Sequence, residues 1–172
     1  FGQVLDASGQ EIGGSFQISA PGLPGSMHVA RDGSVAALAD GGFVVLYTEV
    51  GDFSQTVYGQ RYDSSAAPVG PLFAVTSDFS ADAPDVAGLP DGGFVASWNS
   101  FDPASGSFDI RAQRFGPDGE PLGGAITVSV DEPGMFGQED FGSSIAATSD
   151  GGFAVAWTGL RLSEDGMEDS DG

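Results

Sequence analysis

Hydrophobic residues fall in short runs with alternating polar residues, and turns rich in glycine and proline separate these runs. One pattern recurs: an Asp-Gly-Gly turn, an aromatic residue, and an apolar run that closes on a second large aromatic residue. Its three copies span residues 40–47, 91–98 and 150–157. The two glycines supply the backbone freedom of a tight turn, and the apolar run has the length of one strand. The pattern therefore predicts three β-hairpins, each with its second strand attached.

A second motif, Gln-Arg-aromatic, occurs at Gln60-Arg61-Tyr62 and at Gln113-Arg114-Phe115. A turn and a strand of small residues follow each copy, and the start of the chain fits the same frame with Phe1 as the expected counterpart of Tyr62 and Phe115. The frame divides residues 1–172 into one repeat domain with units of approximately 1–61, 62–114 and 115–172. A repeat period of about 50 residues is typical of propellers and stacked arrays.

The middle unit predicts four strands joined by turns, at residues 85–89, 94–99, 108–115 and 125–130. In this frame the first unit begins in the turn between its third and fourth strands, and the last unit is truncated after its second strand. The predicted fold class is all-β, with antiparallel four-stranded units in a β-propeller-like array. Because propellers hold about four to eight blades, we expect either a partial array or one completed by another chain.

Composition supports many turns around a real core, with 28 glycines, 10 prolines and a hydrophobic fraction of 40%. Cysteine is absent, so no disulfide framework is expected. No run of about 18 apolar residues occurs, so no membrane insertion is expected. The sequence opens on Phe1 rather than on methionine, which we interpret as a fragment or processed product of a larger protein.

Charge narrows the choice of partners. Twenty-five acidic residues face five basic ones, all arginine, and the formal net charge is -20. Nucleic acid and anionic membrane would be repelled by such a chain. The charge favours cations, calcium above all, and is consistent with an extracellular location.

The two motifs resemble the repeats of about 50 residues in large secreted bacterial calcium-binding, adhesin-like proteins related to the repeats-in-toxin group. The matching positions are Asp91 to Trp98, Gln113 to Phe115, Gly119 and Gly124, and nearly all of the chain lies in the frame. The resemblance implies a propeller-like extracellular or cell-surface module with bacterial-type secretion, and it implies no catalytic residues. The Gly-Gly-x-Gly-x-Asp calcium nonapeptides of that group do not occur here, so their calcium chemistry is not carried over.

Acidic loops after the second strand of each unit are the calcium candidates, because calcium takes about six to eight oxygen ligands. The candidate ligands are Asp102 and Asp109 in the middle loop and Asp165, Glu168, Asp169 and Asp171 in the last loop. The alternative interpretation is that the last loop is a solvated acidic tail and that the middle aspartates form turns.

The repeated polar residues are expected to be structural. Asp40, Asp91 and Asp150 suit hydrogen bonds within their own turns. Gln60, Arg61, Gln113 and Arg114 recur in the third strand, where a guanidinium can bind a carboxylate or loop carbonyls of a neighbouring turn. Trp98 and Trp157 fit either the packing between units or an exposed platform for stacking a glycan.

The sequence thus predicts a non-enzymatic extracellular β-repeat module with a structural, adhesion or assembly role and calcium as a candidate stabilising ion. Its expected partners are other chains, or missing repeats of the same chain, at the open sheet edges. A glycan-binding propeller module is the alternative, and a propeller hydrolase comes third. No catalytic constellation is predicted, since the single histidine, His28, has no serine or cysteine at a recognised triad spacing.

Overall fold

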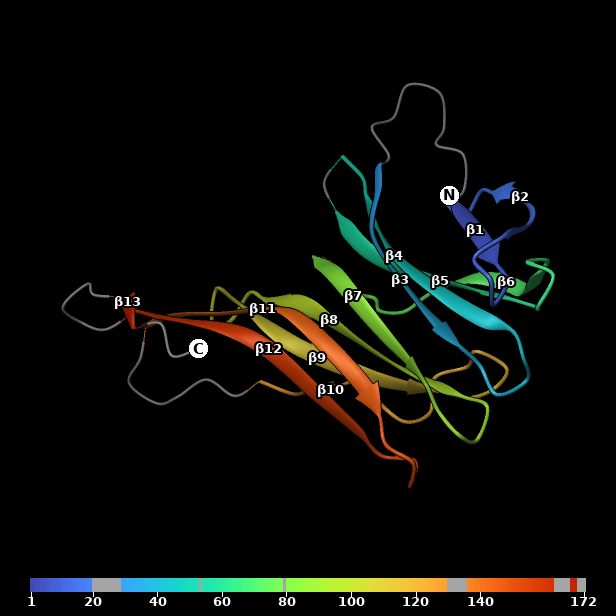
Figure 1. Cartoon of the computed structure of the whole chain (residues 1–172). Coiled ribbons are helices and arrows are strands. Elements are labelled where there is room, and N and C mark those ends of the chain that lie inside the picture. The colour runs from blue at the N-terminus through green and yellow to red at the C-terminus, as the bar shows by residue number, and fades with distance from the viewer. Residues whose placement is uncertain (20–28, 53, 79, 130–135, 163–167, 170–172) are drawn as a thin grey trace.

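The computed structural model describes residues 1–19, 29–52, 54–78, 80–129, 136–162 and 168–169. Regular structure in these residues is entirely β, in four antiparallel sheets of two to four strands (Figure 1). The N-terminal hairpin contains β1 (Gly2–Leu5) and β2 (Glu11–Phe16). The first sheet contains β3 (Val29–Ala37), β4 (Phe43–Val50), β5 (Gln55–Tyr62) and β6 (Pro68–Ala74). The second sheet contains β7 (Ala81–Gly88), β8 (Phe94–Asp102), β9 (Ser107–Phe115) and β10 (Ile126–Thr127). The third sheet contains β11 (Phe136–Ala147), β12 (Phe153–Leu162) and β13 (Glu168–Asp169).

Strands follow one another in chain order within each sheet, as an antiparallel meander requires. The prediction of an all-β fold is confirmed, and the first and second sheets are four-stranded units. In the second sheet the observed strands overlap all four predicted segments. A closed ring of sheets is not among the described features, and the sheets instead follow one another along the molecule (Figure 1).

Each Asp-Gly-Gly turn joins the first and second strands of a sheet. Its first glycine is left-handed, with φ of 87° at Gly41, 89° at Gly92 and 88° at Gly151, which favours glycine over other residues. The second glycine is required for a different reason. A Cβ on Gly42 or Gly93 would collide with the backbone carbonyl oxygen of the aromatic residue that ends the third strand. The turn therefore fixes how closely the third strand can approach.

The three larger sheets pack face to face, with β7 lying against the first sheet and β11 against the second. One core lies between the first and second sheets and includes Val44, Leu46, Phe94 and Trp98. A second, smaller core lies between the second and third sheets and includes Val95 of β8. Alternate residues of β8 thus serve both cores, as the two-residue period of a strand dictates.

Aromatic rings repeat the same contact between successive units. Phe94 and Phe115 stack in the second sheet with ring centroids 4.9 Å apart, and Phe73 of β6 packs against both. Phe43 and Tyr62 stack in the same way in the first sheet at 5.1 Å, under Phe16 of β2. The last strand of one unit therefore covers the aromatic pair of the next.

The N-terminal hairpin corrects one predicted equivalence. The backbone hydrogen bonds of the turn that starts at Asp6 match those of the turn that starts at Asp63. Gln3 donates its side-chain amide to the carbonyl of Val4, as Gln60 does to that of Arg61. Leu5 is therefore the counterpart of Tyr62, and Phe1 is not. The hairpin contains the end of a third strand as well as a fourth strand.

The last unit also extends further than predicted. β13 pairs with the end of β12, with Arg161 opposite Asp169 and Leu162 opposite Glu168. This is the position where β9 begins beside β8 and β5 begins beside β4. A third strand therefore starts in the third sheet, where the sequence predicted that the unit ends after its second strand.

A β-bulge recurs in the first strand of every sheet. The register shifts between Arg31 and Ser34, and it shifts at the matching places in β7 and β11. One residue in each bulge is left-handed, with φ of 53° at Asp32, 46° at Ala83 and 67° at Gly142. Such bulges redirect the side chains that follow them.

In β7 the residue after the bulge is Asp85, which links all three sheets. Its Oδ1 accepts a hydrogen bond of 2.6 Å from Ser34 of β3, and its Oδ2 accepts one of 2.8 Å from the Ile145 amide of β11. One carboxylate therefore fixes the positions of three neighbouring first strands.

We expect opposite effects from exchanging alanine and glycine at two bulges. Ala83→Gly should raise the free energy of unfolding by about 0.5–1 kcal/mol, because a left-handed alanine is strained by about 1–2 kcal/mol and glycine is not. Gly142→Ala should lower it by about 1 kcal/mol, although no atom would touch the added Cβ. Urea denaturation measures both. Gly14→Ala in β2 is the control, since Gly14 is not left-handed and has open space around it; an equal response at Gly14 and Gly142 would contradict the strain.

Candidate functional site

An aspartate–arginine pair ties the third strand of a sheet to its Asp-Gly-Gly turn. In the first sheet, Arg61 Nη2 lies 3.0 Å from Asp40 Oδ2. In the second sheet, Arg114 Nη2 lies 2.7 Å from Asp91 Oδ2. The hydrogen bond from Arg114, together with the amide of Gly93, lowers the pKa of Asp91. Both pairs are partly exposed, so each fixes geometry more than it adds stability.

The glutamine of the repeated motif ties the third strand to the fourth. Gln113 Nε2 donates to the carbonyl of Arg114 at 2.7 Å and to that of Leu122 at 3.2 Å. Gln60 bonds in the same way to the carbonyls of Arg61 and Val69. Gln3 makes the first of these bonds as well, to the carbonyl of Val4. The sequence frame missed this glutamine because valine and leucine follow it, in place of arginine and an aromatic residue.

The third turn is built like the other two but lacks the arginine. Asp150 Oδ1 accepts hydrogen bonds from the Thr148 hydroxyl and from the Gly152 amide, which together lower the pKa of Asp150. Within the described residues no cation pairs with its Oδ2; Arg114 reaches this turn only at the Gly151 carbonyl, at 3.5 Å. The carboxylate therefore presents a free acceptor on the side where the other sheets place a third strand.

β12 has one paired edge and one largely open edge. Its residues from Phe153 to Leu160 pair with β11, and β13 reaches only Arg161 and Leu162 on the other side. Trp157 is 39% exposed on this strand, whereas Trp98, at the same position of β8, is 1% exposed. Among the described residues, the outer edge of β12 at 153–159 thus lacks a neighbouring strand.

Trp98 cannot serve as an exposed glycan platform, because it is buried between the first and second sheets. Its indole N–H donates to Asp78 Oδ2 at 3.3 Å. Of the two tryptophans, Trp157 alone offers ring surface to solvent.

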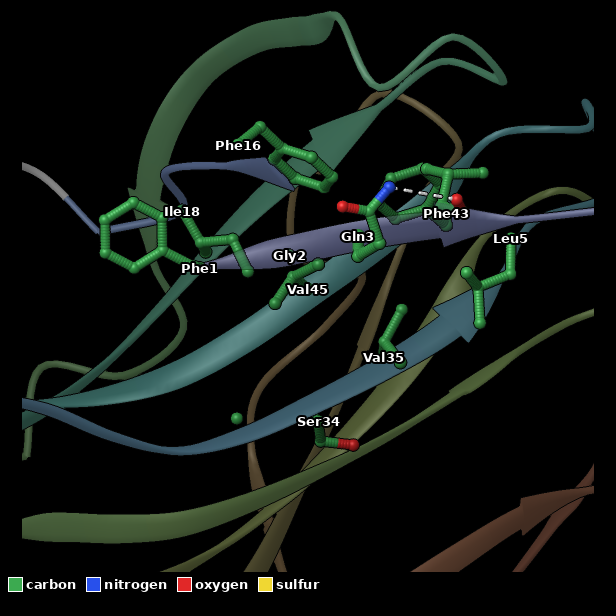
Figure 2. A pocket seen from close by; sticks show the side chains of 12 residues that line it. Phe1, Gly2, Gln3, Leu5, Phe16, Ile18, Ser34, Val35, Phe43 and Val45 are labelled. Atoms are coloured by element: carbon green, nitrogen blue, oxygen red, sulfur yellow. Dashed lines mark hydrogen bonds between the residues drawn. The ribbon is translucent and has the colours of Figure 1, made fainter. Parts of the chain in front are cut away.

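The opposite end of the array has an apolar groove of about 450 Å³ between β1 and the first sheet. Figure 2 shows the residues that line it, among them Leu5 of β1, Val35 of β3 and Val45 of β4. Val35 is 64% exposed, whereas its counterparts Val86 and Ile145 are 6% and 7% exposed. At Val35 the first sheet therefore exposes to solvent a position that the second and third sheets bury against a neighbouring sheet.

The acidic candidates do not form a cluster in the described part of the chain, where no group of three or more His, Cys, Asp or Glu side chains could hold a metal ion. Asp102 Oδ1 accepts the Ala104 amide at 2.8 Å and so shapes its own turn, while Asp109 lies on β9 opposite Ser100. Glu168 and Asp169 form β13 rather than a loop. Asp165 and Asp171 lie outside the described residues. Calcium binding at the last loop stays a prediction.

Asp78 is a half-buried carboxylate that lies outside the two repeated sequence motifs, and its partners lie on other strands. Burial raises its pKa, but the hydrogen bonds from Ser100, Thr76 and Trp98 and the charge of Arg111 outweigh burial, so the pKa is lowered overall. Ser100 donates at 2.8 Å and Arg111 Nη1 lies 3.5 Å away. Asp78 thus joins the loop before β7 to β8 and β9.

No protein-family model matches this chain, and a search of curated proteins finds no similar sequence. In the residues that the structure describes, no helix is long and apolar enough to cross a membrane. Function must therefore be argued from the geometry above.

The second glycines of the turns should differ in their tolerance to substitution. Gly93→Ala should lower the free energy of unfolding by about 2–3 kcal/mol, because the new Cβ meets the Phe115 carbonyl and the backbone must shift. Gly152→Ala should stay within about 1 kcal/mol of the parent, because its Cβ meets only side-chain oxygens of Thr148 and Asp150. Thermal and urea unfolding compare the two. Equal losses would mean that the third-strand carbonyl is not the reason for glycine.

Asp78 should make stability depend on pH. Its folded pKa lies below the unfolded value, so its contribution is present above about pH 4 and is lost as the pH falls through the folded pKa. Asp78→Asn should therefore cost about 1–2 kcal/mol at pH 7 and much less at pH 3. Urea unfolding of parent and variant at the two pH values measures this, and an unchanged difference would show that the ionised form is not the stabilising one.

Proposed function

We propose that this protein is a non-enzymatic extracellular β-repeat module with a structural, adhesion or assembly role, which extends an array by stacking repeat surfaces. The observation that carries the proposal is the exposure of Val35, at a position that two other sheets bury against a neighbour. An apolar surface that copies an internal interface is suited to receive another surface of the same kind.

Both ends of the array support this role. At one end, the groove of Figure 2 exposes Val35 of the first sheet and Leu5 of the N-terminal hairpin. At the other end, β12 exposes backbone hydrogen-bonding groups and Trp157. An open sheet edge is a template for pairing with another chain. The partners proposed are other chains or further repeats of the same chain, in a propeller-like arrangement.

The extracellular location and the use of calcium belong to the proposal as well. The charge of -20 supports an extracellular protein that has cations around it. Because the chain has no cysteine, its stability depends on packing, on bound ions or on neighbouring repeats rather than on disulfides. The resemblance to repeats of secreted bacterial adhesin-like proteins points the same way.

Glycan binding is the second candidate, and Trp157 alone supports it. We favour assembly, because Trp157 lies on the strand with an open edge, while the same position in β4 and β8 is buried on a strand that is paired on both sides. A hydrolase remains the third candidate from the sequence, and none of the contacts described above places a nucleophile beside a base.

Self-association tests the proposal, since a second copy is one source of a compatible surface. Sedimentation velocity should show reversible association that grows with concentration. Val35→Glu should weaken it about tenfold or more while the midpoint of thermal unfolding stays within about 2 °C, because the side chain is already exposed. Leu122→Glu is the matched control, a 51% exposed residue outside the groove. A chain that stays monomeric at every concentration, or equal effects of the two substitutions, would count against assembly through this face.

A further inference from the structure

The backbone groups and side chains along the open edge of β12 indicate which kind of strand would pair with it. In the first and second sheets, the second strand pairs along its whole length with a third strand that ends in Gln-Arg-aromatic. In the third sheet, the pairing seen within the described residues is that of β13, opposite Arg161 and Leu162. The rest of the edge, from Phe153 to Gly159, keeps the features that a third strand contacts in the other sheets.

Two of these features lie in the turn. Asp150 Oδ1 accepts a hydrogen bond from the Gly152 amide, as Asp91 Oδ1 does from the Gly93 amide. Within the described residues, no cation pairs with Asp150 Oδ2, whereas Arg114 pairs with Asp91 Oδ2. Gly152 keeps open the space that the carbonyl of Phe115 fills beside Gly93. A glycine is retained here although nothing in the described chain approaches it on that side except two side-chain oxygens.

Two further features lie on the strand. Phe94 stacks on Phe115 and Phe43 stacks on Tyr62, but no described ring contacts Phe153 in this way. Trp157 is exposed where Trp98 and Tyr47 are buried. β9 and β5 run beside those two residues, whereas no described strand runs beside Trp157 on its outer edge. The carboxylate, the glycine, the phenylalanine and the backbone edge all face the place of one missing strand.

We propose that the outer edge of β12 binds an antiparallel strand from a further repeat of this sequence type, recognised by its Gln-Arg-aromatic ending. The aromatic residue stacks on Phe153 with its carbonyl over Gly152, and the arginine pairs with Asp150 Oδ2. This inference rests on the proposed assembly function and names the partner of one of its surfaces. Main-chain pairing supplies the binding and the side chains set the register, as in other strand-addition complexes.

β1 of a second copy is the competing occupant, and its sequence fits less well. Its residues Gln3, Val4 and Leu5 stand at the positions of glutamine, arginine and aromatic residue. Val4 cannot pair with Asp150, and Leu5 offers no ring to Phe153. The turn that is already formed around Asp150 therefore favours a strand of the complete pattern.

An in-register extension of the full chain tests the proposal. β13 already places Glu168 opposite Leu162, so continuing this pairing brings the fifth residue added after Gly172 opposite Phe153. Adding Arg-Ala-Gln-Arg-Phe, the sequence at 111–115, should slow amide exchange across 153–160 by about tenfold or more and shift Trp157 emission to the blue. The same five residues in scrambled order are the control.

Variants of the extended chain separate the contributions of its phenylalanine, its final arginine and Gly152. Phenylalanine to serine in the extension should remove most of the slowing, whereas its final arginine to glutamine should remove a smaller part, because an exposed ion pair contributes little. Gly152→Ala should abolish the slowing in the extended chain while leaving the unextended chain unchanged. Equal slowing by the scrambled extension, or none by the matched one, would overturn the proposal.

The unextended chain tests the competing occupant. If its β12 exchange slows as protein concentration rises, and Leu5→Ser removes that effect, β1 of a second copy binds the edge and the proposal is wrong. If association in solution depends on Val35 while the extension protects nothing, the assembly function stands and this assignment of the edge fails.

Discussion

The first and second sheets each depend on the close approach of the third strand to the Asp-Gly-Gly turn. The carbonyl oxygen of Tyr62 or Phe115 lies where a side chain on Gly42 or Gly93 would be, so the contact admits glycine alone. With the carbonyl there, the aromatic ring of the same residue lies over Phe43 or Phe94, and the preceding arginine reaches the aspartate of the turn. A single backbone contact thus positions a ring stack and an ion pair, and the ring stack is what the neighbouring unit packs against through Phe16 or Phe73.

Coupling between sheets comes from two sources of different character. The apolar cores supply most of the stabilisation, because burial of side chains such as Trp98 and Phe94 removes large areas from water. Asp85 instead fixes the positions of the sheets relative to one another, because its two oxygens accept hydrogen bonds from the Ser34 hydroxyl on one side and from the Ile145 amide on the other. Arrays in which each repeat contacts only its neighbours gain stability from every added interface. Terminal units therefore lack part of the interface stabilisation that the middle unit gains from two neighbours. The exposed residues Val35 of β3 and Trp157 of β12 mark the surfaces without a described neighbour.

The sequence predicted the fold well where a local pattern determines structure. The Asp-Gly-Gly-aromatic run determines a turn and a strand within eight residues, so all three hairpins and the strands of the middle unit could be predicted. The alignment of Phe1 with Tyr62 failed because β1 keeps only the glutamine of its motif, and Gln3 is recognisable through its hydrogen bond to Val4 rather than through its neighbours. Asp85 and Asp78 were missed because their partners lie on other strands, at sequence separations that no motif records. The platform considered for Trp98 failed for a related reason: strand periodicity says that a side chain faces one side of a sheet, but not whether another sheet covers that side.

The acidity of the chain gives the open edge a means of selection. Exposed edges invite indiscriminate pairing, and native proteins discourage it with charge. Here 25 acidic residues against five arginines make most approaching acidic strands repulsive, and four of those arginines already pair with aspartates in the structure. A strand that brings its own arginine to Asp150 offsets part of this repulsion at one register only. Because a shift of one residue would turn that arginine to the opposite face of the sheet, the same carboxylate that favours the partner also opposes its misaligned forms. In the proposed pairing, charge would therefore contribute little to its strength and much to the choice of strand and register.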